Sequence, residues 1–138
     1  MPKRKLMLEE EYDFELIGIC SSHSDYRLCW GINSALSIEL NKGDDFSVLE
    51  KKTGEHLHSY YEFYDEENHI EFYLIKNISS NYQMLVPEKD QVDYFLIIKN
   101  NYVLEINDIL TRLKQIDSIL TAFIFDPTEL KSKGNLVF

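Results

Sequence analysis

The chain has 138 residues and a mass of 16.3 kDa, which is the size of one domain. Its 44% hydrophobic content, with 9 Tyr, 8 Phe and 1 Trp, excludes a globally disordered chain. The formal net charge of −10 disfavours direct binding to nucleic acid or to a membrane surface, because both depend on cationic side chains.

The N-terminal stretch 1–11 is predicted to be mobile, and 1–138 to form a single domain. The basic start at 3–5 resembles a signal peptide, but the apolar run that follows it is too short for one. No segment is apolar enough for a membrane helix. We therefore expect a cytoplasmic protein in which Cys20 and Cys29 are reduced thiols packed in the core.

The next part of the chain predicts a strand followed by a helix. Residues 14–20 are mostly apolar, which is typical of a central strand. A serine of the polar break 21–24 can cap a helix over 25–36. Residues 38–40 alternate and predict a short strand, whereas the Gly-containing stretch 41–55 predicts a loop.

The middle of the chain predicts an antiparallel hairpin of strands 57–64 and 69–76, joined by the loop 65–68. In this register Glu62 lies directly opposite Glu71. The face that we expect in the core carries Tyr61, Phe63, Ile70, Phe72 and Leu74. The opposite face carries Tyr60, Glu62, Tyr64, His69, Glu71 and Tyr73.

The remaining elements are, in chain order, a polar turn at 77–81, a strand pair at 83–86 and 92–99, an amphipathic helix at 103–116, a strand at 119–125 and a capped turn at 126–129. This order predicts an α+β domain with two layers: a mostly antiparallel sheet of five to seven strands and two main helices packed on one of its faces. The first and last strands each adjoin a helix, so we expect them to be parallel or central members.

One segment resembles the signature of the IPExxxVDY family, small bacterial proteins named for that motif. The residues that carry the resemblance are Val86 (in place of the leading Ile), Pro87, Glu88, Val92, Asp93 and Tyr94. Similarity at 25–28, 62–63, 65–68, 130–133 and 135–136 extends the resemblance over about residues 14–138. The resemblance implies a single-domain cytoplasmic protein and implies no particular activity.

The motif also has a physical interpretation. Pro87 cannot donate to a sheet, so it ends the strand at Val86 and allows one helical turn after it. The carboxylates of Glu88 and Asp93 are predicted to be structural and to accept hydrogen bonds from the open amides of this turn. The alternative is a carboxylate pair for acid–base catalysis or for binding a metal ion.

The hairpin carries the most unusual charge pattern. Like charges directly across two strands are destabilising, so the pairing of Glu62 with Glu71 needs an explanation. His69 on the same face can join both acids around a divalent ion, a cationic side chain of a partner can lie between them, or both can point into water. The tyrosines of this face are typical of protein interfaces, unless a helix covers them as core.

Other polar clusters give weaker signals. His56 and His58 have the spacing of a metal-binding pair on one side of a strand, but a solvated strand end is the simpler interpretation. The serines of 21–24 include no Gly-x-Ser-x-Gly motif, and capping explains them. No glycine pattern indicates a nucleotide or another organic cofactor.

The leading hypothesis is a non-enzymatic interaction module that binds a basic protein partner. Its candidate surface consists of Tyr60, Glu62, Tyr64, Glu66, Glu67, His69, Glu71 and Tyr73. The alternative is a small metal-dependent or acid–base enzyme that uses paired carboxylates. Self-association through an edge strand is a further outcome that the sequence leaves open.

Overall fold

A computed structural model describes residues 12–136, so the mobile terminus predicted for 1–11 lies outside the described part. The main element is a six-stranded antiparallel sheet in the order β2-β5-β6-β7-β1-β8. Its strands are β1 (Glu15–Cys20), β2 (Asn41–Lys42), β5 (Tyr60–Asp65), β6 (Ile70–Lys76), β7 (Tyr94–Lys99) and β8 (Thr121–Phe125). A separate hairpin pairs β3 (Phe46–Glu50) with β4 (Gly54–His58).

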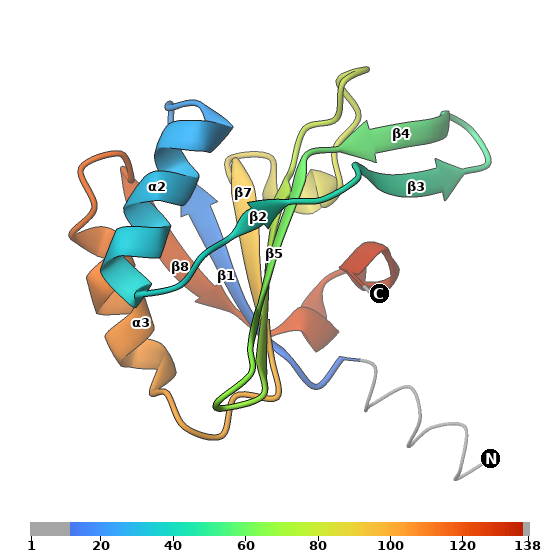
Figure 1. The fold of residues 1–138 in the computed structure, drawn as a ribbon. Coiled ribbons are helices and arrows are strands. Elements are labelled where there is room, and N and C mark those ends of the chain that lie inside the picture. The colour runs from blue at the N-terminus through green and yellow to red at the C-terminus, as the bar shows by residue number, and fades with distance from the viewer. Residues whose placement is uncertain (1–11, 137–138) are drawn as a thin grey trace, which may run out of the picture.

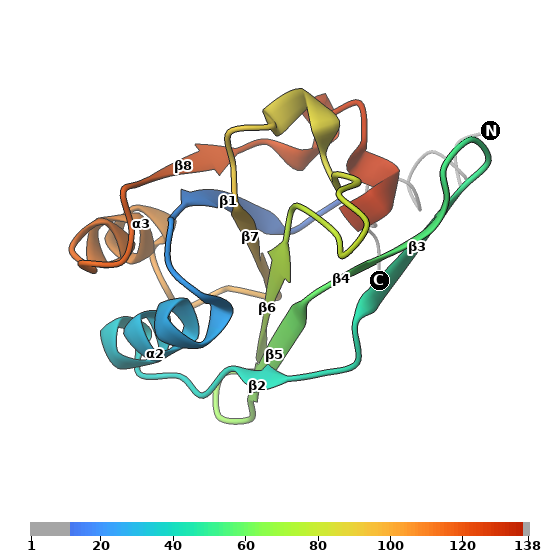
Figure 2. The same cartoon turned by 90° about the horizontal axis from the view of Figure 1, so that it is seen from above.

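Two helices, α2 (Asp25–Leu36) and α3 (Ile106–Lys114), lie side by side on one face of the sheet (Figure 1). The β3–β4 hairpin and the C-terminal segment lie on the other side, as the view from above shows (Figure 2). Short 3-10 turns occur at Pro87–Lys89, Pro127–Glu129 and Lys133–Leu136. The predicted α+β architecture, with helices on one sheet face, is confirmed.

The sheet separates two apolar clusters. Alternate residues of β7 serve both: Leu96 and Ile98 pack toward the helices, whereas Phe95 and Ile97 pack toward the hairpin and the C-terminal segment. Burial on both faces explains why β7 is almost continuously apolar.

Helix α2 has the bounds that the sequence predicts. The Ser24 hydroxyl caps its start by accepting a hydrogen bond from the Arg27 amide at 3.4 Å. Helix α3 is shorter than the predicted 103–116. The Asn101 side chain accepts hydrogen bonds from the amides of Val103 and Leu104, and this turn precedes the helix. The predicted turn at 126–129 is confirmed, with Asp126 as its cap.

The loop predicted for 41–55 is wrong, because this stretch contains β2, β3 and the start of β4. The strand predicted for 57–64 is divided at Ser59 into β4 and β5, and 38–40 is not a strand. The exposed positions of β3 and β4 include Leu49 and Leu57, whereas the buried positions of β4 are His56 and His58, so the two strands lack the usual pattern of apolar buried and polar exposed residues. The glycine at position 54, with φ of 75°, adds a turn signal.

The predicted register of the central hairpin is also wrong. Glu62 lies opposite Tyr73, and Tyr64 lies opposite Glu71. The four-residue connection starts one position later than predicted, because Asp65 still pairs with Ile70 and His69 takes φ of 58° in the turn. The error is an even number of positions, so it leaves every side chain on its predicted face.

Two further expectations about strands are wrong. Residues 83–86 form no strand, and the segment contributes one isolated bridge, between Ile78 and Met84. Strand β1 is an interior strand between β7 and β8, as expected, although it is antiparallel to both. The expectation is wrong for the last strand, because β8 is antiparallel and lies at an edge of the sheet. Every pair of neighbouring strands in this sheet is antiparallel.

Candidate interaction surface

The residues predicted as an interaction surface lie together at the β5–β6 end of the sheet. We call this set the acidic face: Tyr60, Glu62, Tyr64, Glu66, Glu67, His69, Glu71 and Tyr73. Four of its members, with Asn41 and Phe63, line an open hollow of about 530 Å³; these four are Glu62, Tyr64, Glu71 and Tyr73. Glu66 and Glu67 are exposed in the hairpin turn next to it.

The acidic face is directed away from the helices. Phe72 and Leu74 are buried in the cluster beneath α2 and α3, together with the half-buried Tyr61 and Phe63. The alternative in which a helix covers the tyrosines is therefore wrong. Tyr60 and Tyr73 do contribute to packing on their own side, where their rings stack with centroids 5.9 Å apart. Tyr64 is 50% exposed.

Each of the two central carboxylates accepts a hydrogen bond from a neighbouring tyrosine. Tyr60 Oη donates to Glu62 Oε2 at 2.9 Å, and Tyr73 Oη donates to Glu71 Oε1 at 2.5 Å. Asn100 Nδ2 donates to the second oxygen of Glu71 at 2.8 Å. Burial and these carboxylates raise the pKa of both tyrosines, so their hydroxyl groups remain donors. In the observed register the two carboxylates are not directly opposite each other, and each has its own hydrogen-bond donor.

His69 does not join the two acids. Its Nδ1 lies 2.8 Å from Tyr64 Oη, in the exposed turn. Among residues 12–136, no group of three or more His, Cys, Asp or Glu side chains is placed to hold a metal ion. The contacts of Glu62, Glu71 and His69 therefore lend no support to the metal-dependent alternative.

The two acids of the 86–94 motif bind separate segments. Glu88 accepts hydrogen bonds from the amide and the hydroxyl of Ser132, both at 2.8 Å. Asp93 accepts one from the Ser21 amide at 2.8 Å. The prediction that Asp93 accepts from the amides of its own turn is therefore wrong. Burial would raise the pKa of Glu88, but hydrogen bonds from its own amide and from Ser132 outweigh burial and lower it. Both contacts are structural links.

The other motif residues hold the surrounding structure together. Pro87 begins a 3-10 turn, and Val86 and Val92 are buried in the cluster on the hairpin side. Tyr94 Oη donates to Asp25 at the start of α2, and Lys76 forms an ion pair with the same carboxylate at 3.4 Å. The motif thus connects the sheet to the first helix.

Asn77 organises the motif and was not singled out from the sequence. Its side chain is buried, and its Oδ1 accepts from the Val86 amide at 2.9 Å. Its Nδ2 donates to the carbonyl groups of Lys89 and Val92, at 3.1 and 2.8 Å. An asparagine after a strand is a common turn residue, so no local signal distinguishes this role.

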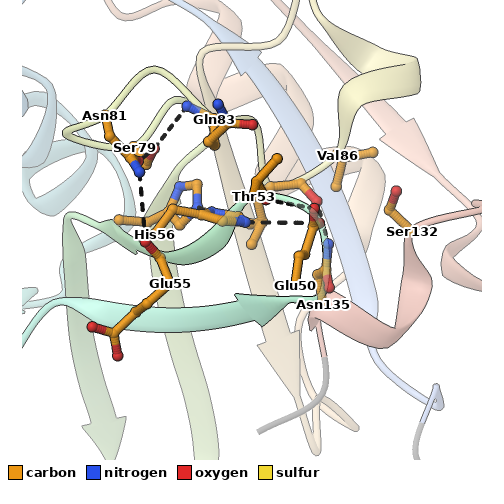
Figure 3. A network of polar contacts seen from close by, with 12 residues as sticks. Glu50, Thr53, Glu55, His56, Ser79, Asn81, Gln83, Val86, Ser132 and Asn135 are labelled. Carbon is orange, nitrogen blue, oxygen red and sulfur yellow. Dashed lines mark hydrogen bonds and ion pairs between the residues drawn. The ribbon is translucent and has the colours of Figure 1, made fainter.

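His56 and His58 are buried, which corrects the expectation of a solvated strand end. His56 Nδ1 and His58 Nε2 lie 2.7 Å apart, a hydrogen-bond distance. His58 Nδ1 lies 2.8 Å from the Lys76 carbonyl oxygen. His56 Nε2 has no hydrogen-bond partner and faces Glu50 Oε1 at 3.7 Å (Figure 3). The pair is a buried polar link between the hairpin and the sheet.

Comparison of the chain with protein-family models, with curated proteins and with solved structures gives no match. None of the helices within residues 12–136 has the length and apolar character needed to cross a bilayer.

Proposed function

We propose that the protein is a non-enzymatic cytoplasmic interaction module whose acidic face binds a basic segment of a protein partner. The observation that supports it is the open hollow in which Glu62 and Glu71 lie beside Tyr64 and Tyr73, on the sheet face away from the helices. The net charge of −10 favours encounter with a basic surface.

The acidic face combines two kinds of group that attract cations. Carboxylates form strong hydrogen bonds with lysine and arginine, and tyrosine rings attract cations through their faces. Lys99 already lies over the Tyr73 ring, with its Nζ 5.7 Å from the centroid. Tyr64, which is 50% exposed, offers a lysine or arginine of the partner an aromatic ring next to the carboxylates of the same hollow.

The proposal is compatible with the resemblance to the IPExxxVDY family, which implies no activity of its own. Membership of that family, like a cytoplasmic location, stays a prediction. The enzymatic alternative has no specific contact in its favour, because the candidate acids Glu62, Glu71, Glu88 and Asp93 each accept hydrogen bonds from neighbouring protein groups.

Affinity purification of the tagged protein from its own host, at low and at high salt, tests this proposal. We expect a stoichiometric partner that is lost at high salt, because exposed charge pairs are screened. The double variant Glu62→Lys plus Glu71→Lys should lose the same partner. The matched control, Asp90→Lys plus Glu129→Lys, reverses two exposed acids elsewhere and should retain it.

Circular dichroism of both double variants ensures that only folded proteins are compared. A partner set that is unchanged by Glu62→Lys plus Glu71→Lys would contradict the proposal. So would a single monomeric species with no partner at low salt. A homo-oligomer that persists in both variants would show instead that the chain associates through another surface.

A further inference from the structure

A second concave surface lies on the helical side of the molecule, remote from the acidic face. It is a groove of about 400 Å³ between α2 and α3, within the size range of small-molecule sites. Its lining comes from one side of α2, the end of α3 and the residues just after it. The lining includes Arg27, Trp30, Gly31, Arg112, Asp117 and Ser118.

The groove concentrates arginine in a chain that is otherwise acidic. The sequence contains three arginines, and the two within residues 12–136 both line this groove: Arg27 on α2 and Arg112 on α3. No ion pair or hydrogen bond within the described residues engages either guanidinium group. Asp117 is the one carboxylate in the lining, so the groove carries a net positive charge.

The only tryptophan of the chain lies in the same groove. Trp30 is 67% exposed, and its indole ring stacks on no other ring within residues 12–136. Arg27 and Trp30 are three positions apart on α2, so both project from one side of the helix. An exposed indole next to guanidinium groups can stack on a planar ring while the arginines bind an anion.

Ser118 supplies a buried polar atom to the floor of the groove. The residue is 4% exposed, and its Oγ has no hydrogen-bond partner. Its carbonyl oxygen accepts from Ser21 Oγ at 2.5 Å, which holds the segment in place. Because buried hydroxyl groups are normally hydrogen-bonded, the free Oγ indicates that a ligand atom can complete the site.

Gly31 keeps the groove open to this depth. A Cβ at this position would lie 2.7 Å from Ile116 Cγ2 and 3.4 Å from Ser118 Oγ. The absence of a side chain allows α2 to approach the end of α3 closely, beside the free hydroxyl of Ser118.

We infer that this groove is a binding site for a small ligand that combines a planar ring with a single anionic group. The ring stacks on Trp30, and the anion lies with Arg27 and Arg112. Ser118 Oγ forms a hydrogen bond with the ligand, and Asp117 accepts one from a hydroxyl or amino group. The anion can be a phosphate, as in a mononucleotide, or a carboxylate, as in an aromatic acid.

Titration of the full chain with AMP and, separately, with benzoate tests this inference and distinguishes the two kinds of anion. Trp30 is the only tryptophan, so a saturable change in its fluorescence reports binding at the groove. Calorimetry gives the same affinity without relying on Trp30. We expect at least one of the two probes to saturate, and its affinity to fall as salt is raised. Adenosine, which lacks the phosphate, should bind at least tenfold more weakly than AMP if the nucleotide is the favoured probe.

Variants at the groove make the test specific. Arg27→Gln and Arg112→Gln should each weaken binding about tenfold or more, because each removes a charge-assisted contact. Ser118→Ala should weaken it several-fold. Lys114→Gln removes the same charge from the exposed side of α3 outside the groove, and should leave the affinity unchanged.

Two results would overturn the inference: no saturable binding of either AMP or benzoate, or binding that both arginine variants leave unaltered. The arginines and the Lys114 control are exposed helix positions, so these variants are expected to fold. The outcome is independent of the acidic face, because Glu62→Lys plus Glu71→Lys should bind the probe as the wild type does.

Discussion

The buried histidine pair shows how a single protonation state can be deduced from neighbouring acceptors. The Lys76 carbonyl can only accept, so His58 Nδ1 must carry the proton and donate. In neutral His58, Nε2 is then an acceptor for His56 Nδ1–H. His56 Nε2, on the other side of that ring, faces Glu50 Oε1 at 3.7 Å. Protonation of His58 Nε2 would turn this acceptor into a donor and would break the bond to His56 Nδ1 unless His56 changes its tautomer.

His58 should therefore make stability depend on pH. Burial, the largest cause, lowers its pKa below the ordinary value near 6.5, and the neighbouring His56 lowers it further. A lowered histidine pKa means that the unfolded state binds more protons, so the free energy of unfolding should fall as pH drops through 6.5. Between about pH 7 and about pH 5.5, wild type should lose more free energy of unfolding than His58→Gln, and titration of the unfolded histidine sets an upper limit of about 1 kcal/mol on the difference.

Urea unfolding of both proteins at several pH values measures this difference. His23→Gln is the control, because His23 forms no side-chain hydrogen bond or ion pair within the described residues and should leave the pH dependence unaltered. Parallel pH profiles for wild type and His58→Gln would contradict the proton order deduced above.

Among the structural elements, the turn at Pro87–Lys89 depends on a partner from the end of the chain. Glu88 accepts both the amide and the hydroxyl of Ser132, and Asn135 Nδ2 donates to the Leu85 carbonyl at 2.8 Å. The C-terminal segment, which buries Leu130 and Leu136 against the sheet, is thereby joined to the motif.

Glu88→Gln should destabilise this link. A glutamine replaces one accepting oxygen with a donating NH2 group and removes the negative charge, so the Ser132 hydroxyl can no longer donate to that atom and the remaining hydrogen bonds are no longer charge-assisted. The expected cost is about 1 kcal/mol of unfolding free energy, since the contact is solvent-exposed. Chemical denaturation of the variant measures it. Glu129 is an exposed acid in the same region whose side chain forms no hydrogen bond or ion pair within residues 12–136, so Glu129→Gln should leave the stability unchanged. Equal stabilities of wild type and both variants would disprove the role of Glu88.

The helices and strands that could be predicted from the sequence are those marked by a cap or by a regular apolar pattern within a few residues. Ser24 caps α2 from within a few residues, and the alternation of β5 and β6 fixes their faces even though the register was wrong by two positions. The β3–β4 hairpin was not predictable, because its half-exposed strands lack a continuous apolar pattern. The hairpin's own Val48, His56 and His58 become buried only when it packs against the sheet.

At the scale of the whole molecule, the net charge of −10 should reduce stability at low salt. Raising NaCl from about 0.01 M to about 0.1 M shortens the Debye length from about 30 Å to about 10 Å and screens this repulsion. We expect the thermal midpoint to rise by a few degrees, as measured by circular dichroism. The variant Asp90→Lys plus Glu129→Lys, which is less negative, should show a smaller rise. A midpoint that falls with salt would indicate that attractive ion pairs dominate.

The candidate sites differ in how far the sequence could reveal them. The acidic face follows from alternation in adjacent strands, so its members could be named in advance, although which sheet face the helices cover could not. The groove of Arg27, Trp30 and Arg112 could not be foreseen, because α2 and α3 are far apart in the chain and become neighbours only through the sheet order.

The sequence by itself determined the fold class, the bounds of α2, the faces of the central hairpin and the turn at Pro87. These depend on residue periodicity, caps and backbone restrictions that act within a few positions. Only the tertiary structure decided which segments accept Glu88 and Asp93, how His56 and His58 become buried, and which helix faces enclose a groove. Those contacts join residues distant in sequence, and their geometry depends on the packing of the complete sheet.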